Sequence, residues 1–292
     1  MKARTLGLLY CIVFFTKDLT GFITYLFVIP TRSQNFADAP KEEARVYGDK
    51  RFIAMMMAKV TCVQLVSMLG YNLLFQDVDI VWFKDPLPYF DKPEIKDYDV
   101  FFQDDGGHSL RYAPYSANSG FYFVRHNDRT RHFLSQLLMA GDLIISTKSH
   151  QQALIAFLQE HVSLHGLRAK VLSRDTEEFP GGFHYHRKNR QFMYDFFAGK
   201  VHPYIFHMSW TTNKNNKLLF FRQMGEWFVQ DKCIQHTVED VLGALPADGD
   251  DTKLFQECCS ADPLISCHYR DKPSKIPCKD SPTIDQNGKD FW

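Results

Sequence analysis

Two acidic residues, Asp77 and Asp79, stand one residue apart in the stretch LLFQDVDIVWFKDPL, which runs from Leu73 to Leu87. If LLF is a buried strand that continues through them, residues i and i+2 point to the same side and the two carboxylates converge. Two negative charges so close repel each other unless a cation lies between them. Mg²⁺ or Mn²⁺ would relieve that repulsion and leave coordination positions for phosphate oxygens. The alternative is that Asp77 caps a turn and Asp79 is solvated.

Five apolar segments predict the elements that position these acids. A helix is expected from Asp49, a plausible N-cap, to Gly70, because Ile53, Met56, Met57, Val60 and Val63 recur at helical spacing. Strands are expected in YNLLF, DYDVFFQDD (97–105), SGFYFVR (119–125) and PYIFHMSW (203–210), and IVWFKDPL is expected to lead the chain away.

Two further helices are predicted between the strands. One covers about 128–140 and is closed by Gly141, and the next begins at Ser149, which forms a capping box with Gln152. A helix through Leu219 is expected after a polar loop, TTNKNNK. Strands that alternate with helices predict an α/β fold, in which helices cover both faces of the sheet and ligands bind beyond the carboxyl ends of the strands.

These motifs together resemble a known family. The stretch YGDKRFIAMMMAKVTCVQLVSMLGYNLLFQDVDIVWFKDPL resembles the nucleotide-diphospho-sugar transferase domain, whose members include plant cell-wall xylosyltransferases that act on rhamnogalacturonan, and the resemblance runs from about Tyr47 to Trp227. It implies a GT-A-type fold with a Rossmann-like mixed sheet. It also implies transfer of a sugar from a UDP-linked donor, through Mn²⁺ or Mg²⁺ and with retention of configuration.

The resemblance assigns roles residue by residue. Asp77 and Asp79 match the family's DxD metal motif, and His207 in FHMSW matches the late histidine that completes the metal site. From the residues alone, His207 could equally be a core histidine bonded to the backbone. Asn118, Ser119 and Gly120 match a motif that lines the donor sugar, where a glycine permits close backbone approach. Lys214 or Lys217 would neutralise the leaving diphosphate, and the alternative is two solvated lysines.

Acceptor handling falls on a different set of residues. Gln151 matches the family's glutamine, but His150 stands where the family has an aspartate. Asp105, or its neighbour Asp104, could hold an acceptor hydroxyl, and the alternative is that both are surface acids. The sequence therefore predicts a metal-dependent glycosyltransferase acting on a glycan or glycoprotein acceptor. The alternative is an inactive relative that binds a glycan or a partner.

The amino-acid composition argues against some classes of function. Lys+Arg and Asp+Glu both number 34, so no basic excess predicts nucleic-acid binding, and 45% hydrophobic residues suffice for a large core. Cys11 and Cys62 read as buried hydrophobic residues, whereas five of the seven cysteines follow Gln230 and favour disulfides over zinc knuckles. We predict three regions, 1–34, 35–245 and 246–292, the last a tail rich in Cys and Pro.

The first region is apolar and has two readings. LGLLYCIVFF and FITYLFVIP could form a signal or single-pass type II membrane anchor, which would place the protein in the Golgi or secretory pathway, or they could be strands of the domain.

Overall fold

The computed structural model describes residues 12–16, 44, 46–184, 190–211, 213–234, 258–267, 270–274, 278 and 283–291. The chain divides into two compact units. We call Tyr10–Val78 with Asp85–Phe179 the sheet unit, and Met1–Leu9 with Asp79–Lys84 and Pro180–Trp292 the Asp79 unit. The predicted region boundaries at 34 and 245 fall outside the described residues and stay predictions.

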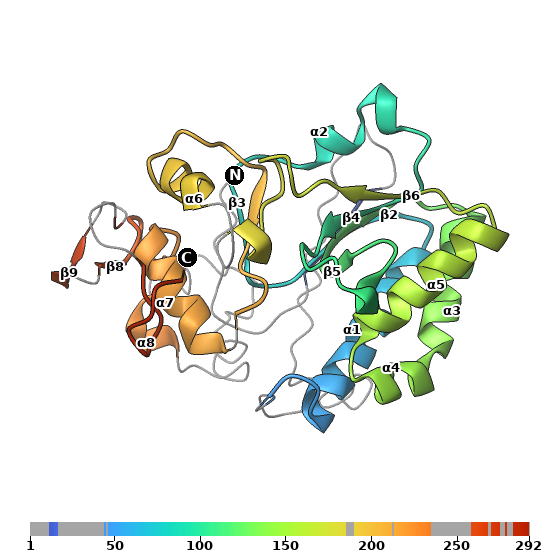
Figure 1. Ribbon diagram of the computed structural model, residues 1–292, viewed down its shortest axis with the longest axis horizontal. Helices are drawn as coiled ribbons and strands as arrows, with labels where there is room; N and C mark the ends of the chain where they lie inside the picture. Colours follow the sequence, from blue (N-terminus) through green and yellow to red (C-terminus); the bar gives the residue numbers. More distant parts are fainter. Residues whose placement is uncertain are drawn as a thin grey trace, which may run out of the picture. The chain divides into compact units, whose positions relative to one another are not determined.

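The sheet unit is built on five strands in the order β1 (Ile12–Thr16), β2 (Asn72–Gln76), β5 (Ala117–Val124), β4 (Val100–Asp104) and β6 (Ala169–Leu172) (Figure 1). Only the β4–β6 pair is parallel, so the sheet is mixed. The α/β prediction is therefore confirmed. For Ile12–Thr16 the structure favours the strand reading of the apolar N-terminal region, while FITYLFVIP lies outside the described residues.

Helices cover both faces of the sheet, as predicted, but unequally. One face is covered by a layer of four helices, α1 (Lys50–Met68), α3 (Asp128–Met139), α4 (Gly141–Thr147) and α5 (His150–Leu164). Against it pack alternate strand residues, among them Phe75, Phe102 and Tyr122. The opposite face is covered by the short α2 (Leu87–Phe90), and Phe90 stacks on Phe123 with ring centroids 4.4 Å apart. The described part of the unit also contains two 3₁₀ turns, Pro93–Ile95 and Leu110–Tyr112.

Helix ends follow the predicted signals in part. Asp49 caps α1 by accepting a hydrogen bond from the Phe52 amide at 2.7 Å, and Gly70 follows the helix at φ +83°. Ser149 does cap α5, but its Oγ accepts from the Gln151 amide, and Gln152 donates to the Thr147 carbonyl. The predicted capping box is therefore wrong, because the Thr147 carbonyl lies within reach of the glutamine side chain. Gly141 follows α3, but it is also the first residue of α4.

The helix α1 has one property of a membrane span. Among the described residues it alone is long and apolar enough to cross a membrane by length and composition. Met56, Val60 and Val63 are nevertheless buried in the core against the sheet, and a core helix passes the same test. Cys62 on this helix is buried as predicted, and burial raises the pKa of its thiol to about 12, while Cys11 lies outside the described residues.

The described residues of the Asp79 unit form two small strand pairs and three helices. The strand β3 (Ile80–Trp82) pairs antiparallel with β7 (Ile205–His207), and β8 (Ile265–Cys267) pairs with β9 (Arg270–Ser274). The helices are α6 (Arg190–Phe197), α7 (Lys214–Met224) and α8 (Asp231–Ile234). IVWFKDPL, which was expected to lead the chain away, begins with a strand, because β7 supplies the hydrogen-bonding partner.

An aromatic core holds this unit together. Phe206 on β7 stacks between Phe196 and Phe220, with ring centroids 5.1 and 5.6 Å away. The segment after residue 258 packs on the same core, since Phe291 meets Phe220 edge to face at 5.2 Å. The disulfide Cys267–Cys278 crosses this segment, as the clustered cysteines predicted.

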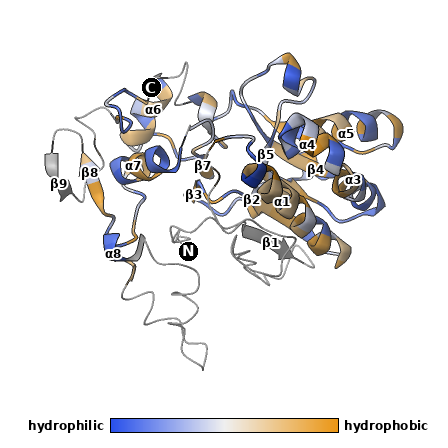
Figure 2. Cartoon of the chain, turned by 90° about the horizontal axis from the view of Figure 1, so that it is seen from below, coloured by the Kyte–Doolittle hydropathy of each residue, from blue (hydrophilic) through white to orange (hydrophobic). Residues whose placement is uncertain are grey.

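Figure 2 shows hydrophobic residues concentrated in β4 and β5, while α3 and α5 carry both hydrophobic and hydrophilic residues.

Candidate active site

The two acids of the DxD motif lie in a turn. The strand β2 ends at Gln76 and β3 begins at Ile80, so Asp77 and Asp79 are not aligned by the pleat of one strand, contrary to the prediction. Hydrogen bonds to different elements hold the turn: the Asp77 amide donates to the Gly120 carbonyl at 2.7 Å, and the Asp79 carbonyl accepts from Met208 at 2.9 Å. Each carboxylate therefore has its own surroundings, in its own unit.

Asp79 is buried between a histidine and a lysine. Its Oδ1 lies 3.4 Å from His207 Nε2, and its Oδ2 forms an ion pair with the ammonium group of Lys217. Asp79 is 7% exposed and His207 2% exposed. Burial alone would raise the pKa of Asp79, but the charge of Lys217 and the contact with His207 outweigh it and hold that pKa well below its usual value. The carboxylate is therefore ionised at neutral pH.

Strand pairing and a capped helix bring together the triad of Asp79, His207 and Lys217. Ile80 pairs with His207 across β3 and β7, which puts the residue before β3 beside the end of β7. The helix α7 begins early because Asn213 caps it by accepting from the Asn216 amide at 2.8 Å. Lys214 and Lys217 therefore lie on the first turns of a helix, and the prediction of a polar loop there is wrong. Lys214 is exposed, and Lys217 is the lysine that reaches Asp79.

Asp77 also has a lysine partner, one that the motifs did not predict. Lys59 on α1 forms an ion pair with Asp77 Oδ1. Burial and the charge of Lys59 lower the pKa of the nearby His150 to about 3, so that imidazole is neutral. A sequence signal for this role existed, because Lys59 is the one charged residue between Arg51 and Asp77. An unaccompanied charge in such an apolar segment needs a partner when it packs.

The predicted donor and acceptor residues of the sheet unit form one hydrogen-bonded network. Asp105 Oδ1 accepts from the amide groups of Asn118 at 2.9 Å and Gln151 at 3.1 Å. Gln151 Oε1 accepts in turn from the backbone amide and the hydroxyl of Ser119, and Asn118 Oδ1 accepts from the Gly120 amide. Asp105, Asn118 and Ser119 are each at most 6% exposed. Asp105 is therefore not a surface acid: it fixes the orientation of both amide side chains.

Asp104 points to a different place from Asp105. It contacts His108 Nε2 at 2.9 Å and lines a pocket of about 430 Å³ in the sheet unit. Tyr112, Tyr115 and Arg174 also line this pocket, and the peptide bond before Pro114, between the two tyrosines, is cis.

The residues around Asp79 fit a divalent cation. A carboxylate oxygen and an imidazole nitrogen 3.4 Å apart are close to the separation of about 3 Å expected for two neighbouring ligands of one ion. The carboxylate is ionised and already balanced by the positive charge of Lys217. The chemistry of this donor set suits Mn²⁺, which accepts both oxygen and imidazole ligands.

Comparison with known proteins decides what these features belong to. The family model described as nucleotide-diphospho-sugar transferase matches residues 25–221, which covers the turn with both acids, the Asn118–Gly120 strand, Gln151, His207 and Lys217. The chain belongs to the nucleotide-diphospho-sugar transferase family. The resemblance that the sequence motifs carried is thereby confirmed, and the mixed α/β architecture of the sheet unit is consistent with a GT-A-type nucleotide-diphospho-sugar transferase domain.

Named relatives of this transferase domain handle several sugars. The chain is 26% identical over 204 residues to a UDP-galactose:fucoside alpha-3-galactosyltransferase of Dictyostelium discoideum, covering 65% of this chain and 30% of the relative. It is 24% identical over 222 residues to UDP-D-xylose:L-fucose alpha-1,3-D-xylosyltransferase 3 of Arabidopsis thaliana, covering 70% and 54%. An Arabidopsis beta-arabinofuranosyltransferase is 34% identical over 88 residues, or 29% and 16%.

The matched transferase region is thus a part of the relatives. The chain spans about a third to a half of the length of the two relatives that it matches over most of its own residues. No solved structure matches this chain.

Proposed function

We propose that this chain transfers a sugar from a UDP-linked donor to a glycan or glycoprotein acceptor. The observation that carries the proposal is the buried triad of Asp79, His207 and Lys217, in a domain of the nucleotide-diphospho-sugar transferase family. An ionised acid, an imidazole and an ammonium group together provide what a metal-bound diphosphate requires. Two of the relatives have names that pair a UDP-sugar with a fucose-containing acceptor, so we include such acceptors among the substrates to be tested.

We propose that Asp77, Asp79 and His207 hold Mn²⁺ or Mg²⁺. When bound, such a cation neutralises the phosphate oxygens of the donor and so stabilises the departing diphosphate. Lys217 donates hydrogen bonds from its ammonium group and adds positive charge on the Asp79 side of the site, where negative charge grows as the glycosidic bond breaks. Lys59 holds Asp77 through an ion pair, which orients that carboxylate.

The amide network positions the sugars. Asn118 and Ser119 border the donor sugar, and Gln151, oriented by Asp105, presents its amide to the reacting hydroxyls. The bond between the anomeric carbon and the diphosphate oxygen breaks, a bond from that carbon to the acceptor oxygen forms, and the acceptor's proton passes to the diphosphate. We propose that the acceptor enters on the side of the leaving group, so that the product retains the donor's configuration.

The test is a transfer assay with purified protein. UDP-galactose, UDP-xylose and other UDP-sugars are offered with fucosides as acceptors, with Mn²⁺ and with a chelator. We expect transfer with Mn²⁺, loss with the chelator, and a product whose anomeric configuration by NMR matches that of the donor. Asp79→Asn should reduce transfer by about 10²–10³-fold, because it removes a negative ligand from the metal. Asp97→Asn, at an exposed aspartate, is the matched control and should leave the rate unchanged.

Other results would contradict the proposal. Full activity of Asp79→Asn would exclude a role for this triad. Failure of any UDP-sugar to bind in calorimetry with Mn²⁺ present would favour an inactive, glycan-binding relative instead.

We also propose a location in the secretory pathway. The support is the Cys267–Cys278 disulfide, since disulfides persist in oxidising compartments and are rare in the cytosol. Microscopy of the full-length tagged chain against a Golgi marker tests this, and a diffuse cytosolic signal would contradict it.

A further inference from the structure

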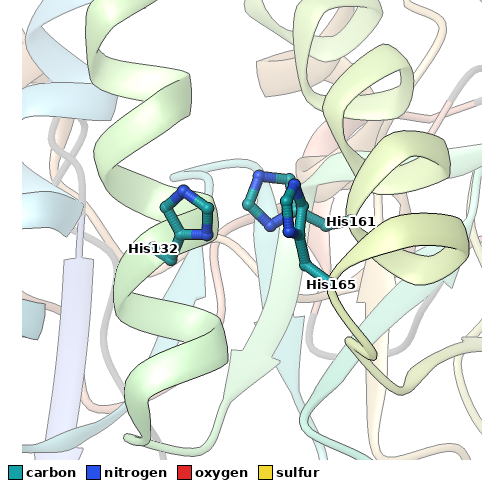
Figure 3. A group of neighbouring side chains, drawn as sticks. All are labelled: His132, His161 and His165. Carbon is teal, nitrogen blue, oxygen red and sulfur yellow. The ribbon is translucent and has the colours of Figure 1, made fainter.

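Three histidines meet on the helical layer of the sheet unit, away from the motifs considered so far. Figure 3 shows His132 facing His161 and His165, with the three rings turned toward one another. The ring centroids are 4.7 Å apart for His132–His161, 4.9 Å for His132–His165 and 4.7 Å for His161–His165. One ring nitrogen of each residue lies within 4.8 Å of one nitrogen of the others.

Helix geometry and helix packing create this cluster. His161 lies in the last turn of α5 and His165 caps that helix, and their spacing of four residues puts both rings on one side. The His165 amide donates to the His161 carbonyl at 3.0 Å, which fixes the turn that relates them. His132 comes from α3, whose Phe133 packs edge to face on His161 at 5.4 Å. Two elements far apart in the sequence therefore supply ligands to one point.

His161 is the unusual member of the three. Its side chain is fully buried, and among the described residues neither of its ring nitrogens has a hydrogen-bond partner. An imidazole without partners is costly to bury, so such a group in a native fold calls for an explanation. Burial, with the charges of His132 and His165, lowers the pKa of His161 to about 4, and Glu160 opposes this only in part.

The other two rings are open to solvent. His132 and His165 are exposed, so an ion can reach the cluster from outside. Glu160 Oε1 lies 4.0 Å from His165 Nε2, and Gln136 Nε2 lies 3.5 Å from His132 Nε2. The cluster thus combines one buried imidazole with two exposed imidazoles, and the Glu160 carboxylate lies at its border.

We propose that His132, His161 and His165 bind a transition-metal dication, Zn²⁺ in preference to the oxygen-seeking Mn²⁺ and Mg²⁺. Three imidazoles with a fourth position for water or the Glu160 carboxylate match the tetrahedral coordination of zinc. Mn²⁺ and Mg²⁺ favour sites with more oxygen ligands, such as the one around Asp79. The bound ion joins α3 to the end of α5 and gives one of the two unpartnered nitrogens of His161 a partner.

The inference is independent of the proposed glycosyl transfer, and the experiment keeps the two apart. The full chain is freed of metal with a chelator and titrated with Zn²⁺ by calorimetry, and with Co²⁺ as a visible-light probe of tetrahedral coordination. The titrations are run in Asp79→Asn so that the DxD motif does not contribute. We expect one equivalent of Zn²⁺ to bind and Co²⁺ to give intense tetrahedral absorption.

Variants at the two exposed histidines locate the site. His132→Gln and His165→Gln should each weaken Zn²⁺ binding by at least about 10–100-fold and abolish the tetrahedral cobalt spectrum. His202→Gln, at an exposed histidine of the other unit, is the matched control and should change neither. The His132 and His165 variants should keep full Mn²⁺-dependent transfer activity in the otherwise unchanged chain.

Two results would overturn the proposal. One is the absence of Zn²⁺ binding by the folded chain, and the other is binding that both glutamine variants retain. Circular dichroism confirms that each variant is folded. If either variant does not fold, X-ray absorption of the Co²⁺-loaded Asp79→Asn chain decides, because a shell of three imidazoles is required.

Discussion

Asp79 and His207 are buried polar residues, and Lys217 supplies the charge that makes this burial tolerable. A buried carboxylate without a cation would be protonated or destabilising, and a carboxylate that binds a metal must be ionised. Lys217 thus prepares Asp79 in the absence of any ion. Lys59 forms an ion pair with Asp77. Each acid of the motif therefore has a lysine of its own, drawn from a helix of its own unit.

The lysines of α7 provide a prediction at this scale. Lys217→Ala should lower kcat for sugar transfer by about 10²-fold or more, because it removes positive charge next to the leaving diphosphate. Lys214→Ala, three residues earlier on the same helix and exposed, should have a much smaller effect. Steady-state kinetics with saturating donor measure both. Equal losses in the two variants would contradict the assignment of Lys217.

At the scale of elements, the entry to α3 is tied to β4 through one carboxylate. Asp99, 3% exposed, accepts from Arg129 Nε and Nη2, from Asn127 and from the Arg168 amide, at 2.7 to 2.9 Å. Burial alone would raise the pKa of Asp99, but these hydrogen bonds and the charge of Arg129 outweigh it and lower that pKa below its usual value. The ionised form therefore stabilises the fold.

This bond network predicts a pH dependence of stability. A lowered pKa in the folded state stabilises the protein above the unfolded value of about 3.9, and that contribution is lost as the pH falls through the folded pKa. Asp99→Asn should cost about 2–3 kcal/mol of unfolding free energy at pH 7, and the difference from the unchanged chain should shrink below about pH 4. Urea unfolding across pH measures this.

The Asp128→Asn variant is the control for that experiment. Asp128 also pairs with an arginine of α3, but its side chain is 92% exposed, so its loss should change stability little at any pH. A pH-independent cost of Asp99→Asn would show that the carboxylate acts only through packing.

At the scale of the whole molecule, the C-terminal segment completes the core of the Asp79 unit. Gln223 on α7 is buried, with 1% of its surface exposed. Its side-chain amide donates to the Ile284 carbonyl at 2.8 Å and accepts from the Ile284 amide at 3.0 Å. The Cys278 amide donates to the Gln223 carbonyl at 3.1 Å, so the disulfide is anchored on the same helix. The tail therefore supports the helix that carries Lys217.

The disulfide allows that support to be measured. Cys267 and Cys278 lie 11 positions apart in the sequence, and closing a loop of this length stabilises a fold by roughly 3 kcal/mol in the chain-entropy estimate. Cys267→Ser, Cys278→Ser and the double variant should each lose about the same stability in denaturant unfolding, because either single change already breaks the bridge. Additive losses would mean that the two residues act separately.

The sequence predicted those parts of the fold that local patterns determine. The α1, α3 and α5 helices and the strands β2, β4, β5 and β7 agree with apolar periodicity and capping residues. The short strands β3 and β6 were missed, because Ile80–Trp82 and Ala169–Leu172 become strands only through their partners. The motif residues Asp79, His207 and Lys217 do meet, although the turn that carries Asp79 was mistaken for a strand.

The sequence motifs could not predict roles that residues acquire only when separate elements pack together. Lys59 acquires its role only when α1 lies along β2, and the histidine cluster only when α3 lies along α5. A lone lysine in an apolar segment is a usable signal. Three histidines on two helices are not, because the spacing between His132 and His161 says nothing until the helices are packed.

The position of Lys59 in the middle of α1 has a consequence for how the chain is made. If the chain enters the secretory pathway as proposed, the translocation channel must let this apolar segment pass without releasing it into the lipid. A lysine at the centre of a segment opposes lipid insertion by about 2.5–3.5 kcal/mol. We expect Lys59→Leu to cause insertion of part of the chains, measurable with a glycosylation reporter after α1. The same ammonium group that holds Asp77 in the folded protein would then also keep α1 available to fold.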